Sequence, residues 1–340
     1  MKLKKILICS IINYVNYRVG DKNLKKTISI IKQNQKNIAE VFKNGVQTDI
    51  VFRELQRDTV GKSGSSPTWG YVYHNEQGRL KFKGIALHKE YDYDYPYDAY
   101  GEKTWSIFGR ELLGDTVRVP IIDVVEEKAN YPEIISYRVM DNNTEDMIHI
   151  KDTLFNKFQR EEMRVKKDIF TIDEILECVK IQIGNEENYK KIERDIIRVV
   201  LLDAVTDNGD RHALNWALVR DEKTGEYTLA VFDHARSFID MFQNRGIKES
   251  GWSTSYITFG IDKGRNYIGS EGKYIVECIS KEYPEYFEEF CDDFENKLQT
   301  ILEFIKKEEM KIDFNRLSDK IRDKNRFLRK LRQRGEIEYD

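Results

Sequence analysis

The sequence predicts an α+β protein with a β-rich N-terminal part and a mainly helical C-terminal part. Short apolar segments separated by turn residues predict strands between about residues 48 and 140. From about residue 141, apolar residues recur at the three- and four-residue spacing of amphipathic helices. A chain of 340 residues is long enough for a large core and two lobes. We therefore expect an N-terminal extension over 1–47, a β-rich lobe over 48–140 and a helical lobe over 141–340.

The composition is that of a soluble globular protein with a heavily charged surface. Hydrophobic residues make up 40% of the sequence and charged residues 34%, which excludes a disordered chain. The net charge of −3 gives no reason to expect nucleic acid or membrane binding. The four cysteines form no Cys-x-x-Cys pair, which indicates reduced thiols in a cytoplasmic protein. None of the five histidines lies at metal-ligand spacing from a cysteine, which argues against a zinc site.

The first residues share features with a secretory signal peptide. Residues 1–5 are basic and residues 6–15 are mostly apolar, but Asn13 interrupts the apolar run and no small-residue cleavage site follows. The run is also too short to span a bilayer. We expect a packed strand or helix here, followed by an amphipathic helix over 22–43.

The β-rich part is expected to form a sheet with one helix. Residues 48–57 suit a strand or a short helix, and a hairpin is expected about the turn at 75–78. The other expected elements are strands at 70–74, 80–89, 117–125 and 134–140 and a helix at 102–113.

The C-terminal part is expected to be helical apart from one hairpin. The apolar run from Ile196 to Leu202 predicts a buried helix that ends at the turn-forming residues 207–209. Two strands, 216–219 and 227–232, are expected to pair across a turn at 221–225. The expected helices are 152–158, 171–183, 189–205, 273–286, 286–308 and 313–334.

Three polar residues flank this hairpin. Asp210 and Asn215 precede it and Asp233 follows it, so the side-by-side ends of the hairpin can bring the three together. Phosphoryl transfer needs a base beside a hydroxyl, with an amide and a second carboxylate to hold Mg²⁺. An Asp-Arg-His run alone would equally suit an Asx turn with a surface ion pair. The spacing of the whole set therefore carries the prediction.

The same block resembles the HipA-like kinase family. The residues that carry the resemblance are N-G-D-R-H-A-L-N-W at 208–216 and V-F-D-H-A-R-S-F at 231–238. The resemblance is weaker across 60–140 and is not traceable in the first fifty residues. It implies a two-lobed, protein-kinase-like fold in which Asp210 is the catalytic base and Asn215 and Asp233 hold Mg²⁺. The order here is Asp-Arg-His, whereas eukaryotic protein kinases have His-Arg-Asp.

A loop rich in serine and glycine follows residue 60. A Walker A loop around Gly61-Lys62-Ser63 fails, because its first glycine would fall at Gln56. The resemblance implies instead a phosphate-binding loop formed by Ser63, Gly64, Ser65 and Ser66. An ordinary flexible connection is the alternative for this segment.

The resemblance also implies a lysine that holds the α- and β-phosphates of ATP. Lys83 and Lys89 compete for this role and Lys81 ranks third; we favour Lys89 because it ends an apolar run. Glu102 matches the helix glutamate that pairs with this lysine. An adenine ring would lie against the segment 134–140.

The resemblance implies an ATP- and Mg²⁺-dependent kinase that phosphorylates serine or threonine of a protein, and itself in the serine-rich loop. A protein substrate and an antitoxin-like or regulatory partner are expected with it. Two alternatives stay open at this point: a small-molecule or lipid kinase with the same site, and a non-catalytic binding protein with the kinase fold.

Overall fold

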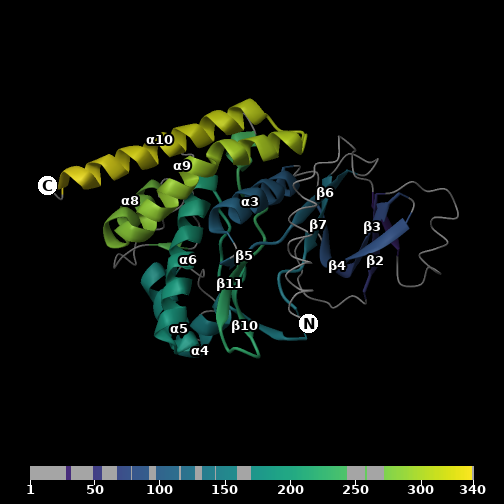
Figure 1. Cartoon of the computed structure of the whole chain (residues 1–340), viewed down its shortest axis with the longest axis horizontal. Helices are drawn as coiled ribbons and strands as arrows, with labels where there is room; N and C mark the ends of the chain where they lie inside the picture. The colour runs from purple at the N-terminus through teal and green to yellow at the C-terminus, as the bar shows by residue number, and fades with distance from the viewer. Residues whose placement is uncertain are drawn as a thin grey trace.

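The computed structural model describes residues 28–31, 49–55, 67–77, 79–91, 97–114, 116–126, 132–141, 143–158, 170–242, 257–258 and 272–338. The serine-rich loop at 63–66, the first residues up to 27 and the segment 92–96 lie outside them. A twisted sheet occupies one end of the molecule and the helices occupy the other, with one helix between them (Figure 1). This is the α+β arrangement predicted from the sequence.

The N-terminal end is a six-stranded sheet in the order β1-β2-β3-β4-β7-β6. Only β1 and β2 pair in parallel; the other neighbours are antiparallel. The predicted hairpin is present as β3 and β4. The strands are β1 (Ile28–Ile31), β2 (Ile50–Glu54), β3 (Thr68–Glu76), β4 (Arg79–Glu90), β6 (Ile122–Glu126) and β7 (Pro132–Tyr137).

Two expectations for this sheet are wrong in detail. Residues 28–31 form β1 and not part of a helix over 22–43, because this isoleucine-rich run can pair along β2. β1 thus belongs to the sheet, although it lies within the predicted extension 1–47. The strand expected at 117–125 is divided at Pro120, which has no N–H to donate to a ladder. Its first part, β5 (Val117–Arg118), joins a different sheet.

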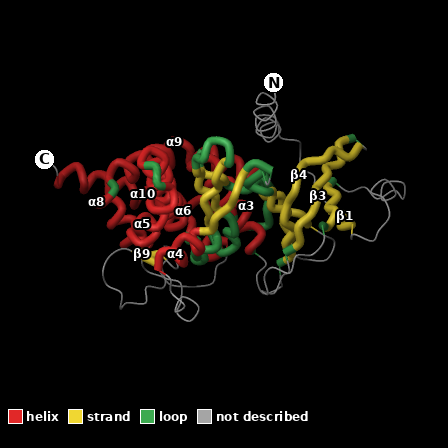
Figure 2. Tube along the Cα trace, turned by 90° about the horizontal axis from the view of Figure 1, so that it is seen from below, coloured by secondary structure: helices red, strands yellow, loops and turns green. Residues whose placement is uncertain are grey.

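The helical half contains the longest of the described elements and a small second sheet in the order β5-β11-β10-β8. Figure 2 shows its helices grouped on one side, with the six-stranded sheet on the other. Its elements are β8 (Glu145–His149), α4 (Ile150–Phe158), β9 (Phe170–Thr171), α5 (Ile172–Ile183), α6 (Glu186–Thr206), β10 (Trp216–Asp221), β11 (Tyr227–Val231), α7 (Ile239–Phe242), β12 (Ile257–Thr258), α8 (Gly272–Glu282), α9 (Pro284–Lys307) and α10 (Phe314–Glu338).

Helix α3 (Asp98–Leu113) connects the two halves. Its first turn packs Ala99 on β6 and β7, whereas its last turns pack Phe108 and Leu112 among the helices. It begins four residues before the helix predicted at 102–113. A side chain on its first turns can therefore face the sheet while the rest of the helix is fixed in the helical core.

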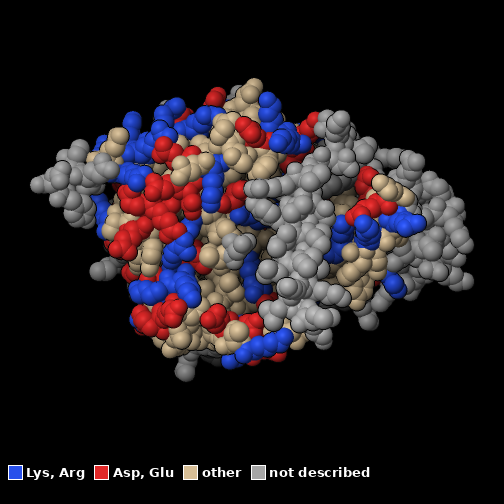
Figure 3. Space-filling model, viewed as in Figure 1, with Lys and Arg blue, Asp and Glu red and all other residues tan. Residues whose placement is uncertain are grey.

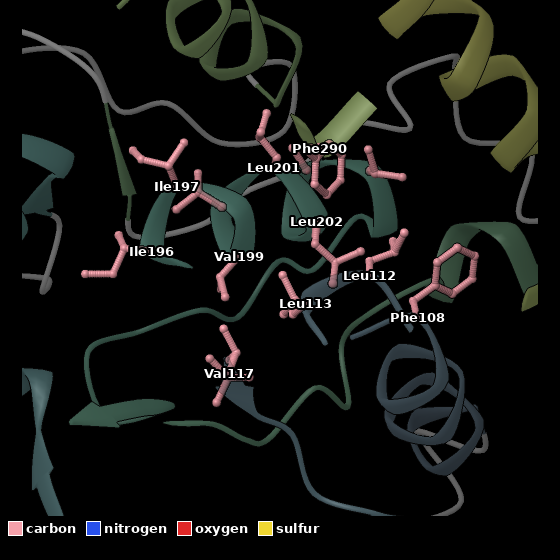
Figure 4. Close-up of a cluster of buried hydrophobic side chains, with 14 of the residues drawn as sticks. Phe108, Leu112, Leu113, Val117, Ile196, Ile197, Val199, Leu201, Leu202 and Phe290 are labelled. Carbon is pink, nitrogen blue, oxygen red and sulfur yellow. The ribbon is translucent and has the colours of Figure 1, made fainter. Parts of the chain in front are cut away.

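Helix α6 lies at the centre of the helical core. Its residues from Ile196 to Leu202 are apolar on every side apart from Arg198, as expected for a helix surrounded by protein. Figure 4 shows Ile196, Ile197, Val199, Leu201 and Leu202 together with Leu112, Leu113 and Phe290. Each such fully buried side chain contributes about 1.5–3 kcal/mol of transfer free energy. This packing thus fixes the C-terminal end of α6, which leads into the segment that contains Asp210 and Asn215.

The predicted hairpin is present as β10 and β11, in a register that pairs Trp216 with Val231. The chain reverses at 221–225, where Gly225 has a φ of +72°. Because the open ends of the two strands are adjacent, Asn215 and Phe232 are neighbours. This register fixes the candidate site described below.

Charged groups of both signs cover the helical half on the face shown in Figure 3. Several form ion pairs between α9 and α10, such as Arg329 with Glu295. No helix among the described residues combines the length and apolar character needed to cross a bilayer. The cysteines described are Cys178, Cys278 and Cys291, and none of these forms a disulfide.

Candidate active site

The segment between α6 and β10 forms a tight loop. At the end of α6, Asp207 takes the left-handed conformation with a φ of 53°. The N–H groups of Asp207 and Asn208 both donate to the carbonyl oxygen of Asp203, which closes the helix. Lys324 of α10 forms a buried ion pair with the Asp207 carboxylate, so the C-terminal helix anchors the start of this loop.

Asp210 and Asn215 are held together by this loop. The Asn215 side-chain amide donates to the Asp210 carbonyl oxygen at 2.8 Å, which leaves its oxygen Oδ1 as the candidate ligand for a cation. The Asp210 N–H lies 3.3 Å from Asn208 Oδ1, which is the Asx-type turn that the alternative interpretation expected. The turn is therefore present, but it positions Asp210 beside Asn215 and does not stand alone.

Asp233 comes two residues after the end of β11, next to Phe232. The Phe232 N–H donates to the Asn215 carbonyl oxygen at 3.0 Å, which extends the hairpin by one pair. Asp233 has a φ of 59°, a left-handed conformation that costs a residue with a side chain about 1–3 kcal/mol. Its side chain is 45% exposed. The carboxylate is thus turned out of the strand direction and stays accessible.

Lys89 lies between two carboxylates from different elements. Its Nζ atom is 2.6 Å from Glu102 Oε1 on α3 and 3.0 Å from Asp233 Oδ1. The pairing of Lys89 with Glu102 expected from the sequence is therefore present. The competing Lys81 and Lys83 both form ion pairs with Glu76 near the opposite end of the hairpin. The geometry thus separates Lys89 from the two other lysines.

The charges in this cluster shift one another. Burial alone would lower the pKa of Lys89, but Glu102 and Asp233 together raise it above its ordinary value. Burial raises the pKa of Glu102 to about 7 despite the neighbouring ammonium group. Burial alone would raise the pKa of Asp233, but the charge and hydrogen bond of Lys89, together with Glu102 and His212, lower it below its ordinary value. Lys89 therefore stays charged at neutral pH, and Asp233 is the more fully ionised of its partners.

Asp210 has the opposite tendency to Asp233. Burial raises its pKa, and the carboxylate of Asp233 adds to the effect, while His212 opposes it. A carboxylate with a raised pKa is a better proton acceptor once it is ionised. The two aspartates are thus distinguished by their surroundings: one suits a cation ligand and the other a base.

Arg211 joins the two backbone segments that carry the candidate metal ligands. Its Nε and Nη2 atoms donate to the two oxygens of Asp203 at 2.7 and 3.0 Å, and both side chains are fully buried. Its Nη1 atom donates to the carbonyl oxygens of Asn215 at 2.8 Å and Phe232 at 3.1 Å. One guanidinium group therefore fixes the backbone on both sides of the site.

The same network reaches α3 through two stacked rings. The His234 ring lies against the Trp105 ring with their centres 3.5 Å apart, and the Arg211 group donates to His234 Nδ1 at 2.7 Å. Trp105 Nε1 in turn donates to Asp203. Burial and then the Arg211 charge lower the pKa of His234 well below its ordinary range. A neutral ring at the residue after Asp233 thus contacts the helix that carries Glu102.

Gly101 allows this close approach of α3. A Cβ atom on Gly101 would lie 2.6 Å from the Ser237 carbonyl oxygen and 2.7 Å from that of Ala235. A Cβ carbon atom does not approach a backbone oxygen so closely, so any larger residue would push the helix away. The glycine therefore keeps Glu102 on α3 within reach of Lys89 and Asp233.

The sequence predicted a shared site for five residues, and the structure brings all of them into one region: Asp210, Asn215, Asp233, Lys89 and Glu102. The four predicted residues of the phosphate-binding loop, Ser63, Gly64, Ser65 and Ser66, lie outside the described residues. Sequence reasoning missed the supporting groups. Asp203 is the acidic residue of an otherwise apolar stretch of α6, which is itself an indication of a buried partner. The sequence around Asp98 did not indicate its partner: Asp98 Oδ2 lies 3.8 Å from Arg236 Nε.

No protein-family model and no curated protein matches this chain. Among solved structures, it is similar to the proinflammatory kinase CtkA of Helicobacter pylori, with a TM-score of 0.54 and 11% identity over 82% of this chain and 92% of that one. The chain has a kinase fold. The two-lobed, protein-kinase-like fold predicted from the sequence is thereby confirmed, at the level of the fold.

HipA of Shewanella oneidensis MR-1, solved with HipB and its operator DNA, is also matched. Its TM-score is 0.47, with 12% identity over 83% of this chain and 65% of that one. At such low identities the likeness concerns the fold, and the chemistry of this chain has to be argued from its own residues.

Proposed function

We propose that this protein is an ATP- and Mg²⁺-dependent kinase that phosphorylates serine or threonine of a protein. The observation that carries the proposal is the position of Lys89, whose ammonium group contacts both Glu102 and Asp233. A lysine on a strand, paired with a helix glutamate and beside a metal-binding aspartate, is the arrangement that kinases use for the phosphates of ATP.

The donor set suits Mg²⁺ and the phosphates of ATP. Asn215 and Asp233 offer an amide and a carboxylate oxygen, the hard ligands that this ion prefers. The bound ion would neutralise charge on the phosphates. Lys89 would hold the α- and β-phosphates, and Glu102 would fix the lysine. Asp210 would orient the acceptor hydroxyl and accept its proton.

The base of ATP has a candidate platform on the sheet. Trp69 of β3 pairs with Leu87, which lies two residues before Lys89 and so on the same face of β4. The Arg138 guanidinium group lies 5.7 Å from the centre of the Trp69 ring, and the Arg138 N–H donates to Ile85. Trp69 is 43% exposed, which leaves ring surface available for stacking.

The test is phosphate transfer from labelled ATP in the presence of Mg²⁺. The purified protein, a panel of protein acceptors and a panel of small-molecule acceptors are incubated separately. We expect label on protein serine or threonine, and on the kinase itself in the serine-rich loop. Label only on a small molecule would show that the acceptor is a small molecule and not a protein. No transfer and no ATP hydrolysis would contradict the proposal as a whole.

The choice of Lys89 gives a direct prediction. Lys89→Met should lower kcat/KM for ATP by about 10²-fold or more, because a charge that contacts the phosphates is lost. Lys83→Met is the matched control, since Lys83 pairs only with Glu76 among the described residues and should retain nearly wild-type activity. Equal losses in the two variants would remove Lys89 from the nucleotide site.

We also propose that this protein has a regulatory protein partner of the antitoxin type. It rests on the resemblance in the sequence. The measurement is co-purification of the full chain with proteins from its own source, followed by the transfer assay in the presence of the captured protein.

A further inference from the structure

Strand β4, which carries Lys89, and the neighbouring strand β7 bring together three other side chains of types that bind metal ions. His88 and Glu90 lie on β4 on either side of Lys89, so they face away from it. Glu133 on β7 pairs directly with Glu90 in the sheet register. The three side chains therefore share the face of the sheet opposite to Lys89.

The ligand atoms are close enough to share one ion. His88 Nε2 and Glu133 Oε2 are joined by a hydrogen bond of 2.7 Å, so a bound ion would take the place of the shared proton between them. One ligand atom from each of the three residues lies within 4.8 Å of the others. The His88 side chain is 4% exposed and that of Glu133 13%, whereas Glu90 is exposed. The site is thus supported from the protein side and open from the solvent side.

The charge at this position is unbalanced. Two glutamates lie directly opposite each other on adjacent strands, an arrangement of like charges that destabilises a sheet. Within the described part of the chain, neither Glu90 nor Glu133 forms an ion pair with a lysine or arginine. A protonated His88 would compensate one carboxylate but not both. A divalent cation would compensate both.

We propose that His88, Glu90 and Glu133 bind a divalent transition-metal ion of the Zn²⁺ class. One imidazole nitrogen and two carboxylate oxygens are ligands that Zn²⁺ accepts, and three protein ligands leave one position for water. A search for histidine and cysteine at metal-ligand spacing cannot detect this site, because it contains no cysteine and Glu133 comes from a different strand. The proposal concerns a second site, apart from Asn215 and Asp233, and does not depend on the kinase function.

An ion at this place would join β4 to β7 directly behind Lys89. Because binding to the folded state alone adds to its stability, the melting temperature should rise with metal concentration. Four-coordinate Co²⁺ in place of Zn²⁺ would add a visible absorption band that reports the coordination.

The experiment is a titration of the metal-free full chain with Zn²⁺, and with Co²⁺, in the absence of nucleotide. Calorimetry gives stoichiometry and affinity, and a thermal melt gives the stabilisation. The decisive variant is Glu90→Gln, because Glu90 is exposed and its replacement should not disturb folding. We expect one ion per wild-type chain and an affinity at least about 10-fold weaker in Glu90→Gln. Glu133→Gln should behave alike.

Two controls separate this site from others. Glu76→Gln removes another glutamate at the end of the same sheet and should leave the Zn²⁺ affinity unchanged. Asp233→Asn removes a carboxylate of the candidate active site and should also leave this affinity unchanged. Wild-type affinity in Glu90→Gln, or failure of the wild-type chain to bind Zn²⁺ at all, would overturn the proposal. Loss of binding in Asp233→Asn alone would assign the ion to the active site and overturn it equally.

Discussion

Asp210→Asn is expected to bind Mg²⁺-ATP nearly as well as the wild type but to transfer phosphate about 10²- to 10⁴-fold more slowly. The substitution keeps the shape of the side chain and removes the carboxylate that we propose as the proton acceptor. Binding should survive because the contact to Asn215 is made by the Asp210 backbone carbonyl, which is unchanged. The measurement is single-turnover transfer from ATP beside a calorimetric ATP titration.

The pH profile gives an independent check on the same residue. A base has to be ionised, and burial raises the pKa of Asp210. Wild-type transfer should therefore be full above this raised pKa and should fall as the pH drops through it. Asp210→Asn should lack this dependence. Equal transfer rates in the two proteins, or an identical acid limb in both profiles, would contradict the role given to Asp210.

Arg211→Met is expected to lower the free energy of unfolding by about 3–5 kcal/mol, the range for removing one partner of a buried ion pair. The pair with Asp203 is fully buried on both sides, so the carboxylate would be left without its counter-charge. The carbonyl oxygens of Asn215 and Phe232 would also lose a donor. Chemical denaturation of both proteins measures the difference.

The surface pair of Arg326 and Asp323 offers a matched control. Arg326 is 70% exposed, and Arg326→Met should change the stability by no more than about 0.5 kcal/mol. Arg211→Lys keeps the charge but not the planar fork, so an intermediate loss is expected. A loss in Arg211→Met no larger than in Arg326→Met would show that the buried network does not hold the site.

Much of the fold could be predicted because the sequence pattern and the packing agree. The hairpins and the long helices follow from periodicity and turn residues, and Asp207 to Gly209 mark the end of α6. The failures have local causes. β1 is stabilised by pairing with β2, a contact distant in sequence. The segment at 117–125 is mostly apolar along its whole length, although its two parts enter different sheets.

The candidate site was predictable where residues lie close in sequence, as around Asp210 and Asn215. Lys89 could be favoured but not separated from Lys83, because the contact that distinguishes it, with Asp233, joins residues 144 positions apart. The contact of Asp233 with Lys89 and the stack of His234 on Trp105 depend on how α3 packs. No spacing rule reports such packing.

Calorimetric titration with ATP tests the central claim most directly, since the claim is that Lys89, Asn215 and Asp233 form one Mg²⁺-ATP site. The wild type and Asp233→Asn are each titrated with Mg²⁺ and with a chelator present. The wild type should bind ATP, and Mg²⁺ should strengthen binding. Asp233→Asn should bind at least about 10-fold more weakly with Mg²⁺ and should lose the metal dependence. Wild-type, metal-dependent affinity in Asp233→Asn would contradict the account.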